Sequence, residues 1–248
     1  MYSKRLKDKV IIVTGGKGLI GRHIVSYCRD NAAIVIDVDI NGKTDLSKGE
    51  FKCDITSEEN LNLLVKEVMS YHGRIDGLVN NAYPRTEDWG LHFEDIPFES
   101  WQKNVDMQMN SVFLLSRKVL EVMKKQKSGS IVNVASIYGV VGNDFTIYEG
   151  YGGTSPAAYS AIKGGIINFT RYLASYFGKD GIRVNCVSPG GIEDKQHPSF
   201  VERYNQKSPL KRMGRAEEIA PAIIFLLSDE ASFVTGHNLM VDGGWTCI

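Results

Sequence analysis

Three side chains in the middle of the sequence have the types and spacing needed to move a proton beside a reacting carbon. Tyr159 and Lys163 are four residues apart in a segment of helical period, so their side chains rise from one helix face. A cation about 4 Å from a phenol would lower the phenol pKa of about 10 by about 3 units. Ser136 follows an apolar run and offers a hydroxyl that can hold a substrate oxygen. We therefore predict proton transfer coupled to a hydride transfer that a cofactor performs.

A glycine-rich turn near the N-terminus has the setting of a dinucleotide phosphate site. The apolar run 10–13 precedes the turn, and a segment of helical period follows it. Gly15 can turn the chain, Gly18 lets the backbone approach a phosphate, and Gly21 lets the helix pack closely on a sheet. A helix N-terminus favours the negative charge of a pyrophosphate. The turn therefore predicts NAD or NADP as the cofactor.

Two aspartates end the next apolar run and bear on the choice between NAD and NADP. Asp39 comes 24 residues after Gly15, about where a carboxylate accepts hydrogen bonds from the adenosine ribose. Asp37 is an alternative ribose ligand. Either carboxylate would repel a 2′-phosphate, so NAD is favoured. Lys17 and Arg22 are basic groups in and after the turn, and they keep NADP open.

The composition bounds the class of protein. The chain has 248 residues and no linker-like stretch, so a single domain over 1–248 is expected. Lys plus Arg and Asp plus Glu number 29 each without a basic block, so neither nucleic acid nor a membrane is an expected partner. The four cysteines form no Cys-x-x-Cys pair and the five histidines have no metal-ligand spacing, so we expect no metal. No apolar leader opens the sequence, and the expected location is the cytoplasm.

Apolar, β-branched runs alternate with amphipathic stretches of helical period along the chain. The runs expected to be strands are 10–13, 33–38, 77–79, 130–134, 182–187 and 239–241. The stretches expected to be helices are 58–71, 98–124, 157–177 and 216–227. This alternation predicts an α/β fold with a Rossmann-type doubly wound parallel sheet flanked by helices. Ligands of such sheets lie beyond the carboxyl ends of the strands, so the chemistry is expected directly after each run.

Together with later motifs, these features resemble the short-chain dehydrogenase/reductase family over nearly the full length of the chain. The later motifs are Asn80-Asn81-Ala82, NCVSPG at 185–190, VTGH at 234–237 and VDGG at 241–244. The resemblance implies that Ser136, Tyr159 and Lys163 are catalytic, and that Lys163 also holds the nicotinamide ribose. It also implies a homotetramer or homodimer, with the 236–245 segment between subunits. The full predicted cofactor-binding set is Gly15, Lys17, Gly18, Leu19, Ile20, Asp39, Asp54, Ile55, Asn80, Ala82, Tyr159, Lys163, Pro189, Gly190 and Ile192.

Four positions depart from the family pattern. Gln108 occupies the position usually filled by a catalytic-site asparagine, and Asn110 follows two residues later. Gln108 is therefore a catalytic candidate that would act through its backbone carbonyl and a water, or the helix would shift to use Asn110. Leu19 and Tyr83 each stand where the family commonly has glycine. Asp194 stands where a threonine often contacts the cofactor carboxamide.

An extra segment, 143–155, separates Ser136 from Tyr159 by more residues than family members commonly carry. It contains Asp144, Tyr148, Glu149 and Tyr151. An insertion beside the catalytic pair is placed to shape the substrate pocket. The expected lid, 193–213, is polar as well. Both segments favour a hydroxylated or charged substrate.

The sequence thus predicts an NAD(P)-dependent oxidoreductase that interconverts a secondary alcohol and a ketone on a small, polar, sugar-like molecule. The chain is also similar, at the inserted segment above all, to oxidoreductases of flagellin-glycan and unusual-sugar pathways. Two alternatives stay open. One is a 3-oxoacyl-[acyl-carrier-protein] reductase, which the family also contains. The other is a dinucleotide-sensing protein that kept the fold and lost the chemistry.

Overall fold

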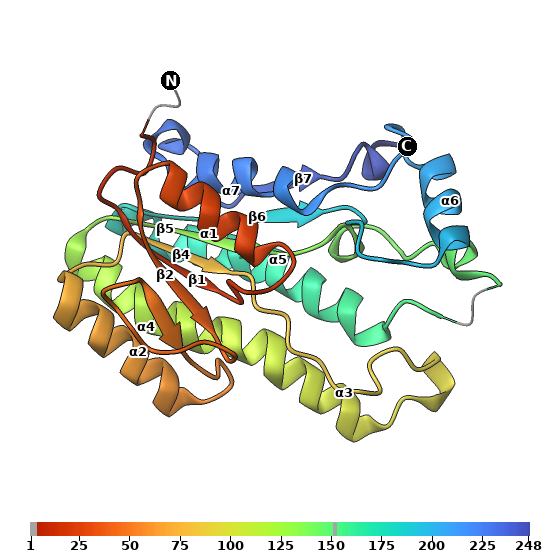
Figure 1. The fold of residues 1–248 in the computed structure, drawn as a ribbon, viewed down its shortest axis with the longest axis horizontal. Coiled ribbons are helices and arrows are strands. Elements are labelled where there is room, and N and C mark those ends of the chain that lie inside the picture. The colour runs from red at the N-terminus through yellow and green to blue at the C-terminus, as the bar shows by residue number, and fades with distance from the viewer. Residues whose placement is uncertain (1–3, 151–152) are drawn as a thin grey trace.

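The structure, a computed structural model, describes residues 4–150 and 153–248, and within them seven parallel strands form one sheet (Figure 1). The strands are β1 (Val10–Thr14), β2 (Ile34–Asp39), β3 (Glu50–Lys52), β4 (Gly77–Asn80), β5 (Gly129–Val134), β6 (Ile182–Pro189) and β7 (Asn238–Val241). Their order across the sheet is β3-β2-β1-β4-β5-β6-β7. The chain therefore changes winding direction between β1 and β4, and in such sheets the crevice at this point holds the ligand. The predicted fold class is confirmed.

Helices cover both faces of the sheet (Figure 1). The helices are α1 (Gly21–Asp30), α2 (Glu58–His72), α3 (Phe98–Val105), α4 (Ser111–Gln126), α5 (Ala157–Phe177), α6 (Pro198–Lys207) and α7 (Ala220–Leu227). Short 3-10 turns occupy Phe93–Asp95, Ile137–Gly139, Phe145–Tyr148, Gly178–Asp180, Ala216–Glu218, Asp229–Ala231 and Trp245–Cys247. In Figure 1, α1 and α7 lie on one face, whereas α2, α4 and α5 lie on the other.

The core follows the alternation of side chains along a strand. In β1, Ile12 packs with α2, α4 and α5, whereas Ile11 and Val13 pack with α1 and α7. All three side chains are fully buried. A strand covered on both faces needs an unbroken apolar run, which is the pattern seen at 10–13. Burial on both faces therefore holds the end of β1, and the glycine turn after it, in a fixed place.

Two expectations from the sequence were wrong in detail. The three-residue strand β3 was missed, because Glu50 and Lys52 flank the buried Phe51 and leave too short a pattern. The expected helix over 98–124 is divided by a π-helical turn at Asp106–Asn110. Such a turn inserts one extra residue and rotates the helix faces on either side of it, which periodicity alone does not reveal.

Candidate active site

The carboxyl ends of five neighbouring strands, β2, β1, β4, β5 and β6, open into a cavity of about 780 Å³. Most of the predicted site residues line it. They are Gly15, Gly18, Leu19, Ile20, Asp39, Asp54, Ile55, Ala82, Ser136, Tyr159, Lys163, Pro189, Gly190 and Ile192. Three predicted residues, Lys17, Asn80 and Gln108, do not line the cavity.

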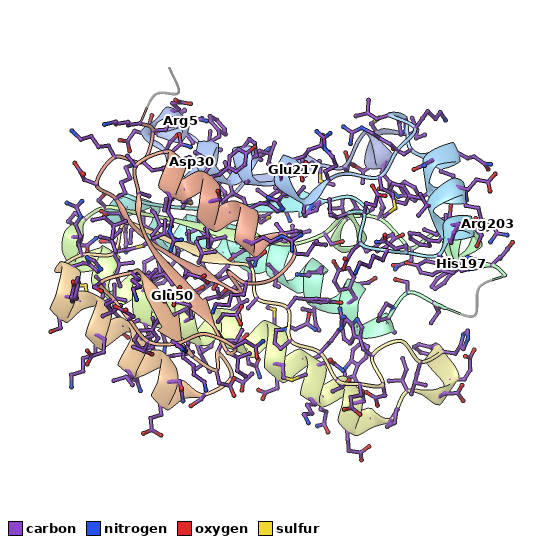
Figure 2. The ribbon with its side chains drawn as sticks, in the orientation of Figure 1. Arg5, Asp30, Glu50, His197, Arg203 and Glu217 are labelled. Atoms are coloured by element: carbon purple, nitrogen blue, oxygen red, sulfur yellow. The ribbon has the colours of Figure 1, made fainter. Side chains whose placement is uncertain are left out.

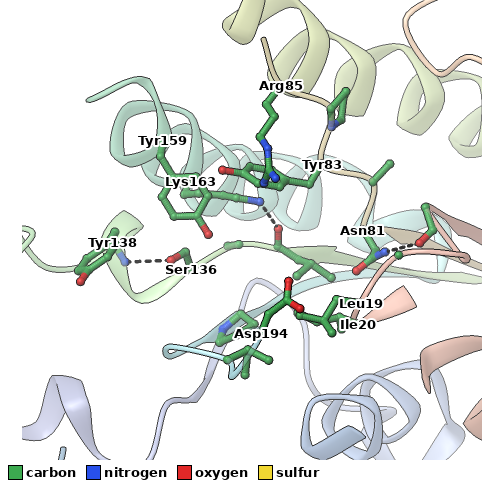
Figure 3. Close-up of a pocket in the computed structure, with 18 of the residues that line it drawn as sticks. Leu19, Ile20, Asn81, Tyr83, Arg85, Ser136, Tyr138, Tyr159, Lys163 and Asp194 are labelled. Carbon is green, nitrogen blue, oxygen red and sulfur yellow. Dashed lines mark hydrogen bonds between the residues drawn. The ribbon is translucent and has the colours of Figure 1, made fainter. Parts of the chain in front are cut away.

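The three residues predicted to be catalytic lie together at one end of the cavity (Figure 3). Ser136 lies two residues beyond the end of β5, and its hydroxyl accepts a hydrogen bond of 3.2 Å from the backbone N–H of Tyr138. Tyr159 and Lys163 lie one turn apart on α5, with the Lys163 Nζ 5.6 Å from the centre of the Tyr159 ring. Lys163 is buried, and its Nζ donates a 2.8 Å hydrogen bond to the carbonyl of Val134. The end of β5 thus orients both the hydroxyl and the ammonium.

Burial dominates the protonation of this group. Desolvation raises the pKa of the Tyr159 phenol, a hydrogen bond with Ser136 opposes the rise, and the nearby Tyr148 phenol adds to it. Burial also lowers the pKa of Lys163 to about 8, which leaves its ammonium mostly charged at pH 7. The expectation that Lys163 by itself lowers the pKa of Tyr159 was therefore wrong. The protein's own groups hold Tyr159 as a neutral phenol, ready to donate a proton.

An aromatic wall supports Tyr159. The rings of Tyr83 and Trp89 meet edge to face at 5.8 Å, and they meet the Tyr159 ring at 5.5 Å and 6.3 Å. The Lys163 Nζ lies 5.5 Å from the centre of the Tyr83 ring. Tyr83, at a position expected from the resemblance to be glycine, therefore fills the space beside the Tyr159 phenol and lies against the Lys163 ammonium.

Two glycines of the first turn are required by close packing. Gly15 has a φ of 65°, and a Cβ on it would lie 2.8 Å from the Cα of Ala82. A Cβ on Gly21 would lie 1.9 Å from the carbonyl oxygen of Gly15. Asn81 holds the turn from the other side, since its amide donates to the carbonyls of Thr14 and Gly15 at 2.9 Å and 3.1 Å. The turn is therefore preformed for a phosphate approaching its backbone.

The structure separates the two candidate ribose ligands. The Asp39 carboxylate lines the cavity and accepts hydrogen bonds from the backbone N–H groups of Lys17 and Asn41 at 3.1 Å and 3.0 Å. Asp37 lies beneath the turn, where its Oδ1 is 1.9 Å from the place that a Cβ on Gly16 would take. Burial and the charge of Asp39 raise the pKa of Asp37. Of the two carboxylates, Asp39 is therefore the one that faces the cavity.

In the motif Asn80-Asn81-Ala82, Asn80 was predicted to line the cofactor site, but the structure places Asn81 there instead. Asn80 is buried, and its amide donates to Ser116 Oγ at 3.1 Å and to Asn133 Oδ1 at 2.8 Å. Asn81 lines the cavity instead. Successive side chains at a strand end point to opposite faces. Asn80 therefore points into the interior, and its neighbour Asn81 points into the cavity that Asn80 was predicted to line.

The π-helical turn decides between Gln108 and Asn110. Asn110 is exposed, and its amide donates a 2.8 Å hydrogen bond to the Asp106 carboxylate on the helix surface. Gln108 is buried, and neither its amide nitrogen nor its amide oxygen has a protein partner among the described residues. The Gln108 carbonyl accepts a hydrogen bond of 3.2 Å from Ser111 Oγ. The structure therefore does not turn Asn110 inward, and Gln108 is the side chain that faces the interior.

The end of β6 forms the opposite wall. Pro189, Gly190, Ile192 and Asp194 all line the cavity. The backbone N–H of Gly191 donates a 2.7 Å hydrogen bond to the Tyr204 hydroxyl on α6. This bond ties the polar lid to the sheet at the place where the nicotinamide end was predicted.

The inserted segment packs on α6 and reaches the cavity. Ile147 is fully buried in a cluster with Phe200, Tyr204 and Met213. Lys207 on α6 pairs with the Asp144 carboxylate, and Arg203 donates to the Glu149 carbonyl. Figure 2 places Arg203 with His197 at the end of the molecule opposite Arg5. The Tyr148 ring meets Phe200 at 5.2 Å and lines the cavity, so the insertion does shape the pocket, while Tyr151 lies outside the described residues.

Comparison with known proteins agrees with this geometry. A family described as enoyl-(acyl carrier protein) reductase matches residues 19–246. Post-translational flagellin modification protein A of Campylobacter coli is 37% identical over 254 residues, covering 97% of this chain and 99% of that protein. The chain belongs to the short-chain dehydrogenase/reductase family. The expected likeness to a protein of flagellin modification is also confirmed.

Two further proteins extend the likeness of this short-chain dehydrogenase/reductase. The 2,5-dichloro-2,5-cyclohexadiene-1,4-diol dehydrogenase of Sphingobium indicum is 35% identical over 260 residues, covering 98% of this chain and 99% of that protein. A short-chain dehydrogenase of Leptospira borgpetersenii, solved with bound NAD⁺, superimposes with a TM-score of 0.90 at 35% identity, covering 99% and 96% of the two chains. The chain is accordingly an oxidoreductase that acts on CH–OH groups.

Some lining residues of this short-chain dehydrogenase/reductase were missed by sequence reasoning. They are Arg85, Tyr138, Gln196, Phe200, Tyr204 and Met213. Arg85 could have been found, because it lies just beyond the carboxyl end of β4; the α6 residues carry no local signal. Within the described ranges, no helix has the length and apolar character needed to span a bilayer. The same residues include no group of His, Cys, Asp or Glu side chains suited to a metal ion.

Proposed function

We propose that this short-chain dehydrogenase/reductase interconverts a secondary alcohol and a ketone on a polar, sugar-like substrate, with NAD as the hydride carrier in preference to NADP. One observation carries the proposal. Ser136, Tyr159 and Lys163 meet at one end of a cavity whose other end presents the Asp39 carboxylate.

The shape of the cavity fits a dinucleotide. Gly15 and Gly18 line the cavity without side chains, so the backbone of the turn can approach a pyrophosphate closely. Asp39 can accept hydrogen bonds from the adenosine ribose, and Asp54 and Ile55, which line the same cavity, would contact the adenine. Pro189 and Ile192 would hold the nicotinamide end. When bound, the nicotinamide supplies or accepts the hydride, and its oxidised form adds a positive charge beside the phenol.

The protein's own residues handle the proton and the substrate oxygen. Ser136 Oγ holds the oxygen of the alcohol or ketone beside Tyr159. The Tyr159 hydroxyl donates its proton to the ketone oxygen in reduction, and in oxidation the Tyr159 phenolate takes the proton from the alcohol. The Lys163 ammonium would hold the nicotinamide ribose and stabilise the phenolate that remains after donation. Trp89 and Tyr83 limit the access of water to the phenol.

The cavity wall supports a small cyclic substrate that carries hydroxyl groups. Tyr138 and Gln196 offer hydrogen-bonding groups, while Phe200 and Met213 offer apolar surface for a ring. Tyr148, from the inserted segment, lies against Phe200. The Sphingobium relative is by name a dehydrogenase of a cyclic diol, which agrees with this class. Sugars and cyclic polyols are therefore the first substrates to screen.

Calorimetric titration with NADH and NADPH tests the cofactor assignment before any substrate is known. We expect the wild type to bind NADH about tenfold more tightly or better, since a carboxylate facing a 2′-phosphate loses a charge-assisted hydrogen bond and gains repulsion. Asp39→Asn should bring the ratio of the NADPH and NADH dissociation constants closer to one. Asp37→Asn is the matched control, because Asp37 does not face the cavity, and it should keep the ratio. A preference for NADPH in the wild type would contradict the assignment, as would an unchanged ratio in Asp39→Asn.

An exposed aromatic surface supports a homodimer or homotetramer. Phe113 on α4 and Tyr172 on α5 are 44% and 60% exposed. Phe169 stands between them, 6.2 Å from Phe113 and 6.4 Å from Tyr172 between ring centres. We propose that a second copy of the chain covers this α4–α5 face, and that β7 at the sheet edge forms a second contact. We also place the enzyme in the cytoplasm, where the free thiols of its cysteines would stay reduced.

A further inference from the structure

Arg85 introduces a positive charge at the mouth of the candidate active site. It lies two residues beyond Tyr83 on the segment that follows β4, and it lines the cavity. Its guanidinium carbon is 5.5 Å from the centre of the Tyr83 ring. Figure 3 shows the Arg85 side chain extending to that ring. One aromatic ring therefore separates the guanidinium from the catalytic phenol of Tyr159.

The backbone that carries Arg85 is held in place by hydrogen bonds to α3. The next residue, Thr86, donates its N–H to the Asn104 side chain at 3.1 Å, and its hydroxyl accepts from the Asn104 amide at 2.8 Å. Asn104 is 2% exposed, so this pair is protected from water. The Ser100 hydroxyl joins the same network by donating a 2.7 Å hydrogen bond to the Asp88 carboxylate. The structure thus positions Arg85 in advance of any ligand.

The second feature of Arg85 is its charge, which no carboxylate of the described residues neutralises. Among the described residues, none forms an ion pair with it. The nearby Asp88 is engaged by Thr86 and Ser100, whose hydrogen bonds lower its pKa. Figure 3 places Asp194 on the opposite side of the cavity. The remaining lining carboxylates, Asp39 and Asp54, belong to the adenosine end.

We propose that Arg85 binds an anionic group of the substrate, either a carboxylate or a phosphate. This inference rests on the proposed function and names the substrate class for the same site. A guanidinium presents a planar pair of donors that matches both anions. Arg85 contacts the Tyr83 side chain, but among the described residues no carboxylate forms an ion pair with it, and it borders the open cavity. Because the Tyr83 ring lies between Arg85 and Tyr159, the anionic group is several bonds from the carbon that reacts. An acidic sugar or a sugar phosphate has this arrangement.

Three probes that share one hexose ring test the proposal on the full-length, NADH-loaded protein by calorimetry. They are D-glucose, D-glucuronate and D-glucose 6-phosphate. We expect at least one anion to bind about tenfold more tightly than glucose, as a charge-assisted hydrogen bond at a partly exposed arginine allows. The tighter anion distinguishes a carboxylate substrate from a phosphate substrate. Arg85→Gln should remove the preference, and Arg85→Lys should keep part of it.

Two controls separate this inference from the proposed function. Lys66→Gln removes one positive charge from the exposed face of α2, away from the cavity, and should keep the anion preference. The NADH dissociation constant should be the same in Arg85→Gln as in the wild type. If neither anion is preferred over glucose, or if Arg85→Gln keeps the preference, the anion assignment fails while cofactor binding stands. If Arg85→Gln instead weakens NADH binding, Arg85 is a cofactor ligand and the inference is overturned. If NADH does not bind at all, the proposed function fails together with the inference.

Discussion

Replacing Lys163 by methionine should stabilise the chain at neutral pH while abolishing turnover. Burial lowers the pKa of Lys163 from 10.5 to about 8 in the folded protein. Between these two values the unfolded chain binds more protons than the folded one, so stability rises with pH across this range. A difference of about two and a half pKa units, at about 1.4 kcal/mol each, means that the buried ammonium lowers the free energy of unfolding by about 3 kcal/mol at pH 7.

Removing the buried ammonium raises the free energy of unfolding, but part of this increase is lost because the variant also loses a hydrogen bond. Methionine cannot donate to the Val134 carbonyl, and the loss of that hydrogen bond costs about 1 kcal/mol. Lys163→Met should therefore be more stable than the wild type by about 2 kcal/mol at pH 7. The advantage should disappear by about pH 10, where Lys163 is neutral in the folded protein and about three quarters protonated in the unfolded chain.

Urea unfolding followed by tryptophan fluorescence, at several pH values between 7 and 10 and one protein concentration, measures this difference. Comparing the variant with the wild type at each pH cancels the titration of every other group. Lys66→Met is the matched control: this lysine is exposed, and its difference from the wild type should be flat with pH. An equally flat difference for Lys163→Met would refute the reasoning that burial destabilises the catalytic cation.

Three further substitutions test the site and the assembly. Tyr159→Phe should abolish turnover and leave the NADH dissociation constant unchanged, because only the proton donor is lost; substantial residual turnover would contradict the proton-transfer role. Gly21→Val should weaken NADH binding and lower stability by about 1 to 3 kcal/mol, since a Cβ would overlap the Gly15 carbonyl oxygen; calorimetry and urea unfolding would show both effects, and unchanged values would mean that the turn is not packed as described. Tyr172→Glu, which places a charge on the exposed α4–α5 face, should lower the mass measured by light scattering, whereas an unaltered mass would exclude this face as a subunit contact.

Local patterns were sufficient for the parts of the protein that depend on neighbouring residues. The run at 10–13 is apolar because β1 is buried on both faces, and that pattern is visible without knowing the neighbours. Gly15 and Gly21 are spaced for one tight turn, and Tyr159 and Lys163 for one helix face. In each case the physical constraint spans only a few residues. The alternation of strands and helices predicted the fold class, and most of the site residues predicted from the sequence line the cavity.

Other site features depended on contacts between distant segments. Asp37 and Asp39 look equivalent in the sequence, and only packing beneath Gly16 turned one of them away from the cavity. Asn80 and Asn81 are likewise distinguished by which face of β4 meets α4. The π-helical turn, invisible to periodicity, left Gln108 inside and Asn110 outside.

The sequence by itself determined the fold class, the tight glycine turn and the shared helix face of Tyr159 and Lys163, because each is encoded by residue types at short spacing. Only the tertiary structure decided the pKa values of the Tyr159 and Lys163 side chains. Burial raises the pKa of Tyr159 and lowers that of Lys163, opposite to what their spacing alone suggested for the phenol. The absence of an ion pair on Arg85 among the described residues is likewise a property of its surroundings. Desolvation and charge pairing depend on every segment that surrounds a group in space, and short spacing along the chain carries no record of those segments.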